Sequence, residues 1–176
     1  VQAWEHALTF QDVFGLERVS VVGRDADRAA ALAARIEAEL GVTASTADSE
    51  AVAEADVVVT CTAATAPLFD GTLVPEHATV VAMGSHTTDA RETDDALARR
   101  ATVAVESRDS AAREAGDVTL AIDSGALAGI EDTVTLAELV AGTARRREGA
   151  PALFVTTGMP WQDLVVASAV ARVVLG

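Results

Sequence analysis

The chain passes from an apolar run into a polar loop at Val80-Val81-Ala82-Met83-Gly84-Ser85-His86-Thr87-Thr88-Asp89-Ala90-Arg91-Glu92. The apolar part ends in glycine, and small, hydroxyl-bearing and titratable residues follow it. Open α/β sheets bind their ligands in loops of this kind, just beyond the carboxyl ends of the strands. The stretch therefore predicts a buried strand followed by a functional loop.

Apolar runs alternate with helical patterns along the rest of the chain. The run 57–61 is apolar on both faces, which is typical of a parallel strand covered by helices. This alternation predicts an α/β fold, a Rossmann-type doubly wound and mostly parallel sheet. We expect strands at 18–22, 42–46, 57–61, 79–83, 102–105 and 152–155, and helices at 2–13, 28–40, 49–55, 94–100, 110–115, 136–141 and 161–174.

Composition excludes several classes of partner. The 176 residues carry a formal net charge of −14, which repels nucleic acid and anionic lipid, so we expect neither nucleic acid nor a membrane as partner. The N-terminus lacks the pattern of a signal peptide, which favours a cytoplasmic protein. Cys61 is the single cysteine, expected within a strand, so neither a disulfide framework nor a cysteine-based metal site is expected. All 13 basic residues are arginine, so this chain supplies no catalytic lysine.

Nearly the whole chain resembles the ornithine cyclodeaminase and μ-crystallin family, whose members include ketimine reductases and alanine dehydrogenases. The resemblance rests on the 80–92 block and on three other segments: Val1-Gln2-Ala3, Pro67-Leu68-Phe69-Asp70-Gly71, and Thr156-Thr157-Gly158-Met159-Pro160-Trp161-Gln162-Asp163. In the family, Val-Gln-Ala follows a Gly-x-Gly turn that opens the dinucleotide fold, so Val1 and Gln2 are expected at the cofactor.

The resemblance also implies how the chain is divided. We expect residues 1–157 to form an NAD(P)-binding Rossmann-type domain that lacks its first strand and glycine-rich turn. We expect residues 158–176 to form a helix that returns towards a missing substrate and dimerisation domain. The missing strand would be central, leaving its neighbours' edges unpaired. A different sheet order, complete in itself, is the alternative.

The end of the second strand of a dinucleotide fold separates NAD from NADP, because an acid there accepts the ribose hydroxyls while arginine pairs with a 2′-phosphate. Here Gly23 stands where an NAD enzyme carries an acid, and Arg24 follows. Arg28, one helical turn further on, is placed to close on the same phosphate. This pattern favours NADP(H). In the alternative, Asp25 both caps its helix and reaches the ribose, which favours NAD(H).

Two further segments are expected at the cofactor. Thr60, Cys61 and Thr62 follow a strand, where small side chains let the backbone approach the ligand and hydroxyls can bond it. By resemblance, Met83, Gly84 and Ser85 form the nicotinamide-side loop, and Thr157 or Thr156 bonds the nicotinamide amide.

The family's cyclodeaminases and alanine dehydrogenases carry an aspartate two residues beyond the loop glycine, where this chain has His86. A histidine titrates near neutrality and can deliver a proton to an imine while hydride moves to carbon. The alternative is an exposed loop histidine without a catalytic task. Glu92 is expected in the first turn of the next helix, where its charge favours the helix dipole.

These observations predict an NADP(H)-dependent oxidoreductase of a small imino or α-amino acid, inactive as this fragment alone, with His86 as candidate proton donor. The resemblance implies a homodimer formed through a domain absent from this chain. Three alternatives stay open: an NAD-dependent ornithine cyclodeaminase-like lyase, a non-catalytic μ-crystallin-like NADP(H)- or small-ligand-binding protein, and an unrelated Rossmann-like domain for another adenine-containing ligand.

Overall fold

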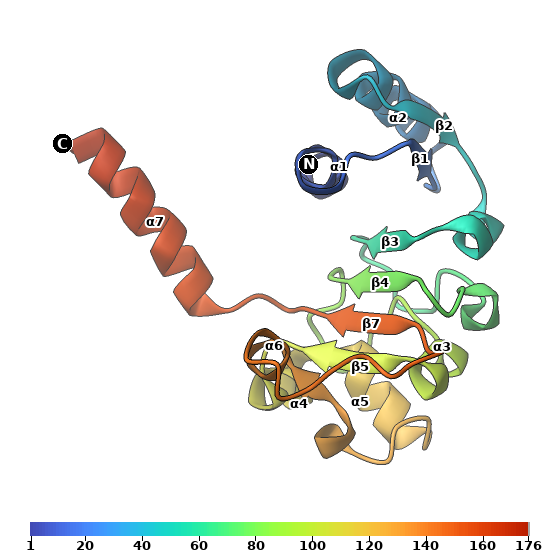
Figure 1. Cartoon of the computed structure of the whole chain (residues 1–176), viewed down its shortest axis with the longest axis vertical. Helices are drawn as coiled ribbons and strands as arrows, with labels where there is room; N and C mark the ends of the chain where they lie inside the picture. Colours follow the sequence, from blue (N-terminus) through green and yellow to red (C-terminus); the bar gives the residue numbers. More distant parts are fainter. Residues whose placement is uncertain (176) are drawn as a thin grey trace.

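The computed structural model describes residues 1–175 as two all-parallel sheets with flanking helices (Figure 1). The larger sheet has five strands in the order β3-β4-β7-β5-β6, and the smaller pairs β1 with β2. The expected α/β architecture with a doubly wound parallel sheet is confirmed. The strands are β1 (Arg18–Val21), β2 (Thr43–Thr46), β3 (Val57–Thr60), β4 (Thr79–Ala82), β5 (Thr102–Val105), β6 (Val134–Thr135) and β7 (Ala152–Val155).

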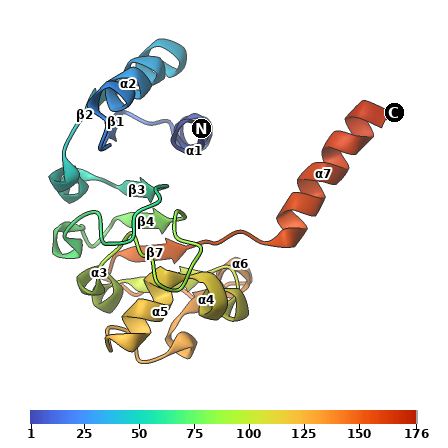
Figure 2. The same ribbon diagram turned by 180° about the vertical axis from the view of Figure 1, so that it is seen from behind.

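Seven α-helices and three short 3₁₀ segments connect the strands in residues 1–175. In both ribbon views, α4 and α5 lie together beneath the β5 end of the larger sheet (Figures 1 and 2). The α-helices are α1 (Gln2–Phe14), α2 (Ala26–Leu40), α3 (Asp95–Arg100), α4 (Arg108–Glu114), α5 (Gly116–Asp123), α6 (Leu136–Val140) and α7 (Pro160–Leu175). The 3₁₀ segments are Ser49–Glu54, Gly71–Leu73 and Ile130–Asp132.

Each sheet has its own hydrophobic core. The larger core gathers fully buried side chains from β4, β7 and the helices beside them, with Val80, Leu97 and Leu153 at 0% exposure. The smaller core joins α1 and α2 to β1 and β2 around Ile36 and Val42. Alanine-rich helix faces allow this close packing, because small side chains bring helix and sheet together.

No strand ladder joins β1 to β3 within residues 1–175, so each of these strands has one edge without a strand neighbour. The expectation that 57–61 would be buried on both faces is therefore wrong. Val57 is 38% exposed, and Val58 and Val59 are only partly buried. The prediction inferred burial from the apolar side chains alone, but a strand is buried only where other elements also cover it, and β3 is an edge strand.

The expected helix ends agree with the structure. Gly15 and Gly41 end α1 and α2 with positive φ values of 69° and 68°, and the Asp25 carboxylate accepts the Arg28 N–H at 3.0 Å to cap α2. Positive φ favours glycine because other residues clash there.

Other expected elements differ from the structure. The sequence pattern missed α5 and β6, since α5 follows α4 after a single residue and β6 has only two residues. The segment expected as helix 49–55 is a 3₁₀ helix, and Cys61 lies just beyond β3 instead of within it.

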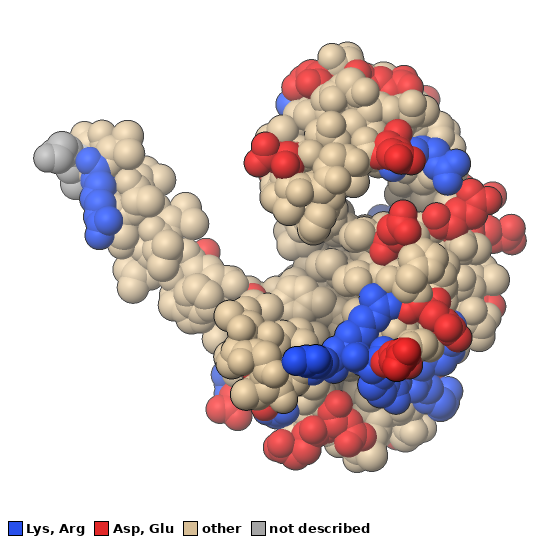
Figure 3. All heavy atoms as spheres, in the orientation of Figure 1, with Lys and Arg blue, Asp and Glu red and all other residues tan. Residues whose placement is uncertain are grey.

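Several arginines gather on the lower part of the face seen in Figure 3, although the chain as a whole is acidic. Arg146 donates to the carbonyls of Ala150 (2.7 Å), His77 (2.8 Å) and Glu76, and Arg147 donates to the Arg100 carbonyl at 2.6 Å. These side chains tie together segments that precede strands. Within residues 1–175, no helix combines the length and the apolar character needed to cross a membrane.

Candidate functional site

The carboxyl ends of β3, β4, β7 and β5 form one edge of the larger sheet. Thr60, Ala82, Val155 and Val105 are successive partners across these four strands, so they end at the same level. Figure 1 shows the arrowheads of the four strands pointing the same way. The loops that begin at residues 61, 83, 106 and 156 therefore leave the sheet side by side.

Glu92 lies at the centre of this edge, with 0% exposure. One carboxylate oxygen, Oε1, accepts the backbone N–H and the hydroxyl of Thr62, both at 2.7 Å. The other, Oε2, accepts the Thr60 hydroxyl at 2.7 Å and the Gly84 N–H at 2.8 Å. The Glu92 carbonyl accepts the Leu68 N–H at 2.9 Å. One buried residue thus joins the loop after β3 to the start of the loop after β4.

The interpretation of Glu92 as a first-turn helix residue is wrong. Helix α3 begins at Asp95 and is capped by Asp94, so Glu92 lies before the cap. Sequence spacing alone did not reveal that the Glu92 side chain turns inward and accepts hydrogen bonds from donors at the ends of β3 and β4.

Gly84 has no room for a side chain. A Cβ atom there would lie 2.0 Å from the Thr62 carbonyl oxygen and 2.5 Å from Glu92 Oε1. Glycine is required because the two loops cross closely at this point, and close backbone approach needs a residue without Cβ. This requirement matches the prediction that Gly84 ends the strand and starts the loop.

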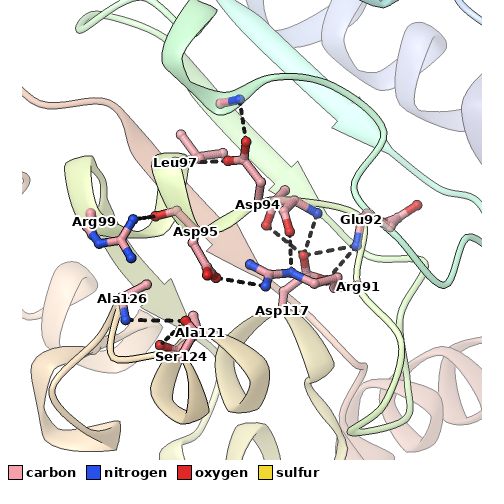
Figure 4. Close-up of polar contacts among 12 residues, drawn as sticks. Arg91, Glu92, Asp94, Asp95, Leu97, Arg99, Asp117, Ala121, Ser124 and Ala126 are labelled. Atoms are coloured by element: carbon pink, nitrogen blue, oxygen red, sulfur yellow. Dashed lines mark hydrogen bonds and ion pairs between the residues drawn. The ribbon is translucent and has the colours of Figure 1, made fainter.

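A second buried carboxylate, Asp117 in α5, holds the backbone of Glu92 and Thr93 (Figure 4). Its Oδ1 accepts the Glu92 N–H at 3.1 Å, the Thr93 N–H at 2.7 Å and the Thr93 hydroxyl at 2.6 Å. Burial raises the pKa of Asp117 above its ordinary value and the charge of Glu92 raises it further, although the hydrogen bonds act the other way. Sequence reasoning missed Asp117 because it missed α5.

The loop after Gly84 folds over the start of α5. The buried Ser85 hydroxyl donates to the carbonyls of Ala90 and, at 3.3 Å, Thr87. A Cβ atom at Gly116 would lie 1.8 Å from the Ala90 carbonyl oxygen. The Ser85 hydroxyl is therefore used within the loop. His86 is exposed beside it, with Nδ1 3.3 Å from the Gly84 carbonyl oxygen.

Thr60 and Thr62, which were expected at the cofactor, both donate their hydroxyl hydrogens to the Glu92 carboxylate. The Thr62 hydroxyl also accepts the Ala64 N–H at 3.1 Å, so it serves the loop on both its donor and its acceptor side. Cys61 is partly buried between them. Burial raises the pKa of its thiol, the Glu92 carboxylate raises it further, and the Val1 amino group opposes both. Val1 is the N-cap residue of α1 and Gln2 is its first residue; both are exposed.

The last loop at this edge follows β7. Thr157 lines a small hollow with Glu106, Ser107 and Ser110. Glu106 accepts the Gly158 N–H at 3.0 Å and the Gln162 side-chain amide at 2.7 Å, which ties this loop to the end of β5. Glu106 is a second residue that sequence reasoning missed, because its role depends on contacts with residues that lie 52 and 56 positions further along the chain.

The remaining predicted residues lie on the smaller sheet's side of the molecule. Gly23, Arg24, Asp25 and Arg28 follow β1 and open α2, and all four are exposed. Neither the Arg24 nor the Arg28 guanidinium has a hydrogen-bond or ion-pair partner within residues 1–175. One Asp25 oxygen is committed to the α2 cap. Two unpaired guanidinium groups beside a helix N-terminus suit a phosphate monoester.

The chain belongs to the ornithine cyclodeaminase/mu-crystallin family, whose profile matches residues 1–175. It is 34% identical over 170 residues to the ketimine reductase mu-crystallin of Mus musculus, an alignment that covers 97% of this chain and 51% of the mouse protein. It is 35% identical over 165 residues to the Delta(1)-pyrroline-2-carboxylate reductase of Paracoccus denitrificans, covering 92% of this chain and 52% of that one. Both relatives are reductases of compounds that contain a C=N bond.

A solved structure agrees with this assignment. The Thermococcus litoralis Delta(1)-pyrroline-2-carboxylate reductase, in complex with NADH and L-proline, superimposes with a TM-score of 0.88 at 26% identity. The superposition covers 95% of this chain and 53% of the Thermococcus chain. The chain thus spans about half the length of the relatives that it matches.

Proposed function

We propose that this chain is the cofactor-binding part of an NADP(H)-dependent reductase, or reversible dehydrogenase, of a small imino or α-amino acid. The observation that carries the proposal is the shared edge of β3, β4 and β7, where parallel strands end at one level and loops from 61, 83 and 156 leave together. Dinucleotides bind at such an edge in open α/β sheets. The relatives' reductase activities and the NADH of the Thermococcus enzyme support it.

The residues at the edge suit a nicotinamide ribose. Gly84 offers backbone without a side chain, Thr157 lines the small hollow beside Glu106 and Ser107, and Cys61 follows the end of β3. Thr60, Thr62 and Ser85 act indirectly, because their hydroxyls shape the loops. When bound, the cofactor supplies hydride, and this chain's residues orient it.

The preference for NADP(H) over NAD(H) rests on the end of β1. Arg24 and Arg28 are exposed and unpaired within residues 1–175, and Gly23 leaves space for a 2′-phosphate. Asp25 is the competing acceptor for an unphosphorylated ribose, but one of its oxygens holds the α2 cap.

The histidine of the β4 loop is proposed as the proton donor. His86 is exposed at the edge, with its Nδ1 3.3 Å from the Gly84 carbonyl oxygen. An imidazolium there would protonate the nitrogen of an imine while hydride reaches carbon.

We further propose that the longer protein supplies a strand and glycine-rich turn between β1 and β3, next to Val1 and Gln2. The unpaired edges of β1 and β3 support this placement. Residues 1–157 would then be the dinucleotide-binding domain, and 158–176 would connect it to a substrate and dimerisation domain. Along α7, which projects from the body in Figures 1 and 2, exposed apolar side chains are available for that domain: Trp161, Leu164, Val165, Val166, Val170, Val173 and Val174.

The test is a fluorescence titration of the full-length protein with NADPH and NADH, for the wild type and Arg24→Ala. Loss of a charge-assisted phosphate contact is expected to weaken NADPH binding about tenfold to hundredfold and to leave NADH binding unchanged. Arg113→Ala, another exposed arginine, serves as the matched control.

Two other outcomes point to different functions. NADH binding equal to or tighter than NADPH binding contradicts the NADP(H) preference and favours Asp25, reviving an NAD-dependent lyase. Binding without reduction of Δ1-pyrroline-2-carboxylate favours a non-catalytic binding protein.

A further inference from the structure

We infer that Glu92 is the positioning residue of the dinucleotide site, an inference that rests on the proposed function. Its carboxylate sets the distance between the loop after β3 and the loop after β4, and thereby the shape of the cradle that receives the cofactor. It does so from beneath the loops, with no exposed surface of its own.

The hydrogen-bond pattern supports this role. Four donors from Thr60, Thr62 and Gly84 converge on the two carboxylate oxygens at 2.7–2.8 Å, and two of the donors are backbone N–H groups, one from each loop. A carboxylate is the one side chain that accepts at both oxygens in this geometry. The Gly84 site, with no space for Cβ, shows how closely the two loops are held.

The anchoring of Glu92 itself separates this role from simple burial. Asp117 in α5 fixes its backbone N–H, and Leu68 donates to its carbonyl. The residue is thus held on both sides of its Cα atom, and its side chain is left to hold the loops. Through Glu92, the position of α5 therefore fixes the positions of the two loops at the edge of the sheet.

Replacement by glutamine tests the idea, because each Glu92 oxygen accepts a backbone N–H. In either orientation the new amide group would face one of those N–H groups, and one loop would be released. We expect Glu92→Gln in the full-length enzyme to raise KM and Kd for NADPH about tenfold, equivalent to about 1.4 kcal/mol. KM for Δ1-pyrroline-2-carboxylate at saturating NADPH should stay within about twofold.

A double-mutant cycle and a control add a second readout. Thr62→Val lies at an exposed position and removes a hydroxyl that donates to Glu92. Added to Glu92→Gln, it should weaken NADPH binding less than additively, since both changes remove the same contact. Glu138→Gln removes another hydrogen-bonded carboxylate, far along the chain in α6, and should lower Tm without changing Kd for NADPH.

The outcomes are distinct. A folded Glu92→Gln variant with wild-type Kd for NADPH overturns the inference, as does an equal rise in Kd for Glu138→Gln. If Glu92→Gln does not fold, the Thr60→Val/Thr62→Val double variant decides: raised Kd supports the role and unchanged Kd refutes it. Failure of the wild type to bind either dinucleotide overturns the proposed function instead.

Discussion

Asp117 offers a direct test of how the site is held, through paired substitutions to alanine and asparagine in the full-length protein. The carboxylate is 1% exposed, and its Oδ1 accepts the N–H groups of Glu92 and Thr93 and the Thr93 hydroxyl. Alanine removes the acceptor. Asparagine can place its carbonyl oxygen at the Oδ1 position and keep all three contacts.

The magnitude follows from those contacts. Alanine leaves two backbone N–H groups of buried residues without an acceptor, at about 1–3 kcal/mol each, so a loss of about 2–6 kcal/mol is expected in the free energy of unfolding. Asparagine sacrifices only the longer contact from the Glu92 N–H to Oδ2, at 3.3 Å. Its expected cost at pH 7 is about 1 kcal/mol or less.

The pH dependence gives an independent signature. Because burial raises the pKa of Asp117 in the folded state, the folded protein holds this proton more tightly than the unfolded chain does. The contribution of Asp117 to wild-type stability therefore decreases as pH rises from the ordinary value of 3.8 through the raised pKa, and this contribution is then constant. The asparagine variant lacks this decrease, so its stability relative to the wild type should improve over that range.

Urea unfolding followed by circular dichroism, at pH values from about 3 to 7, measures both effects. Equal destabilisation by alanine and asparagine would refute the assignment of the loss to unpaired N–H groups. A difference between asparagine and wild type that does not change with pH would contradict the raised pKa.

Three further predictions concern packing and charge. Gly84→Ala should lower the free energy of unfolding by about 1–3 kcal/mol and abolish tight NADPH binding, since the new Cβ would lie 2.0 Å from the Thr62 carbonyl oxygen. Gly129→Ala is the control without an expected effect, because Gly129 has an extended φ and a Cβ there would have no atom within 4 Å. Equal effects of the two substitutions would contradict the packing argument. Leu153→Ala, in the centre of β7 at 0% exposure, should cost about 2–5 kcal/mol by urea unfolding, and a loss below about 1 kcal/mol would show that this core is loosely packed. The hydrogen bond from the Thr135 N–H, and after it the hydrogen bond from Arg108, lower the pKa of Glu138 to about 2. The stabilisation from the Glu138 carboxylate is therefore complete above pH 4.5 and is lost as pH falls towards 2. Glu138→Gln should flatten that part of the curve of stability against pH, and an unchanged curve below pH 4.5 would contradict this prediction.

Local pattern predicted most of the elements that position the site. Asp25 at the start of α2 and the glycines at the ends of α1 and α2 marked helix boundaries correctly, because capping and positive φ depend on neighbouring residues. Elements that lack such local signals were missed. Helix α5 has no side-chain cap, and β6 is two residues long and depends on β5 for its hydrogen bonds.

The candidate site also has features that the local sequence predicted and features that it did not. The sequence predicted functional loops after three strands, and the parallel strands bring Thr60, Met83 and Thr157 to one edge. It did not indicate the roles within those loops. Thr60, Thr62 and Ser85 were expected to face a ligand, but their hydroxyls donate to protein acceptors.

The amino-acid sequence by itself determined the alternation of strands and helices, the parallel sheet, and the small and hydroxyl-bearing residues at its carboxyl edge. These properties follow from periodicity, turn chemistry and chain direction, which act over a few residues. Only the tertiary structure decided that Glu92 and Asp117 are buried, that Gly84 has no room for Cβ, and that β1 and β3 are unpaired at one edge. Those properties depend on groups that lie 8 to 32 residues apart in the chain and meet only when the sheet and helices pack.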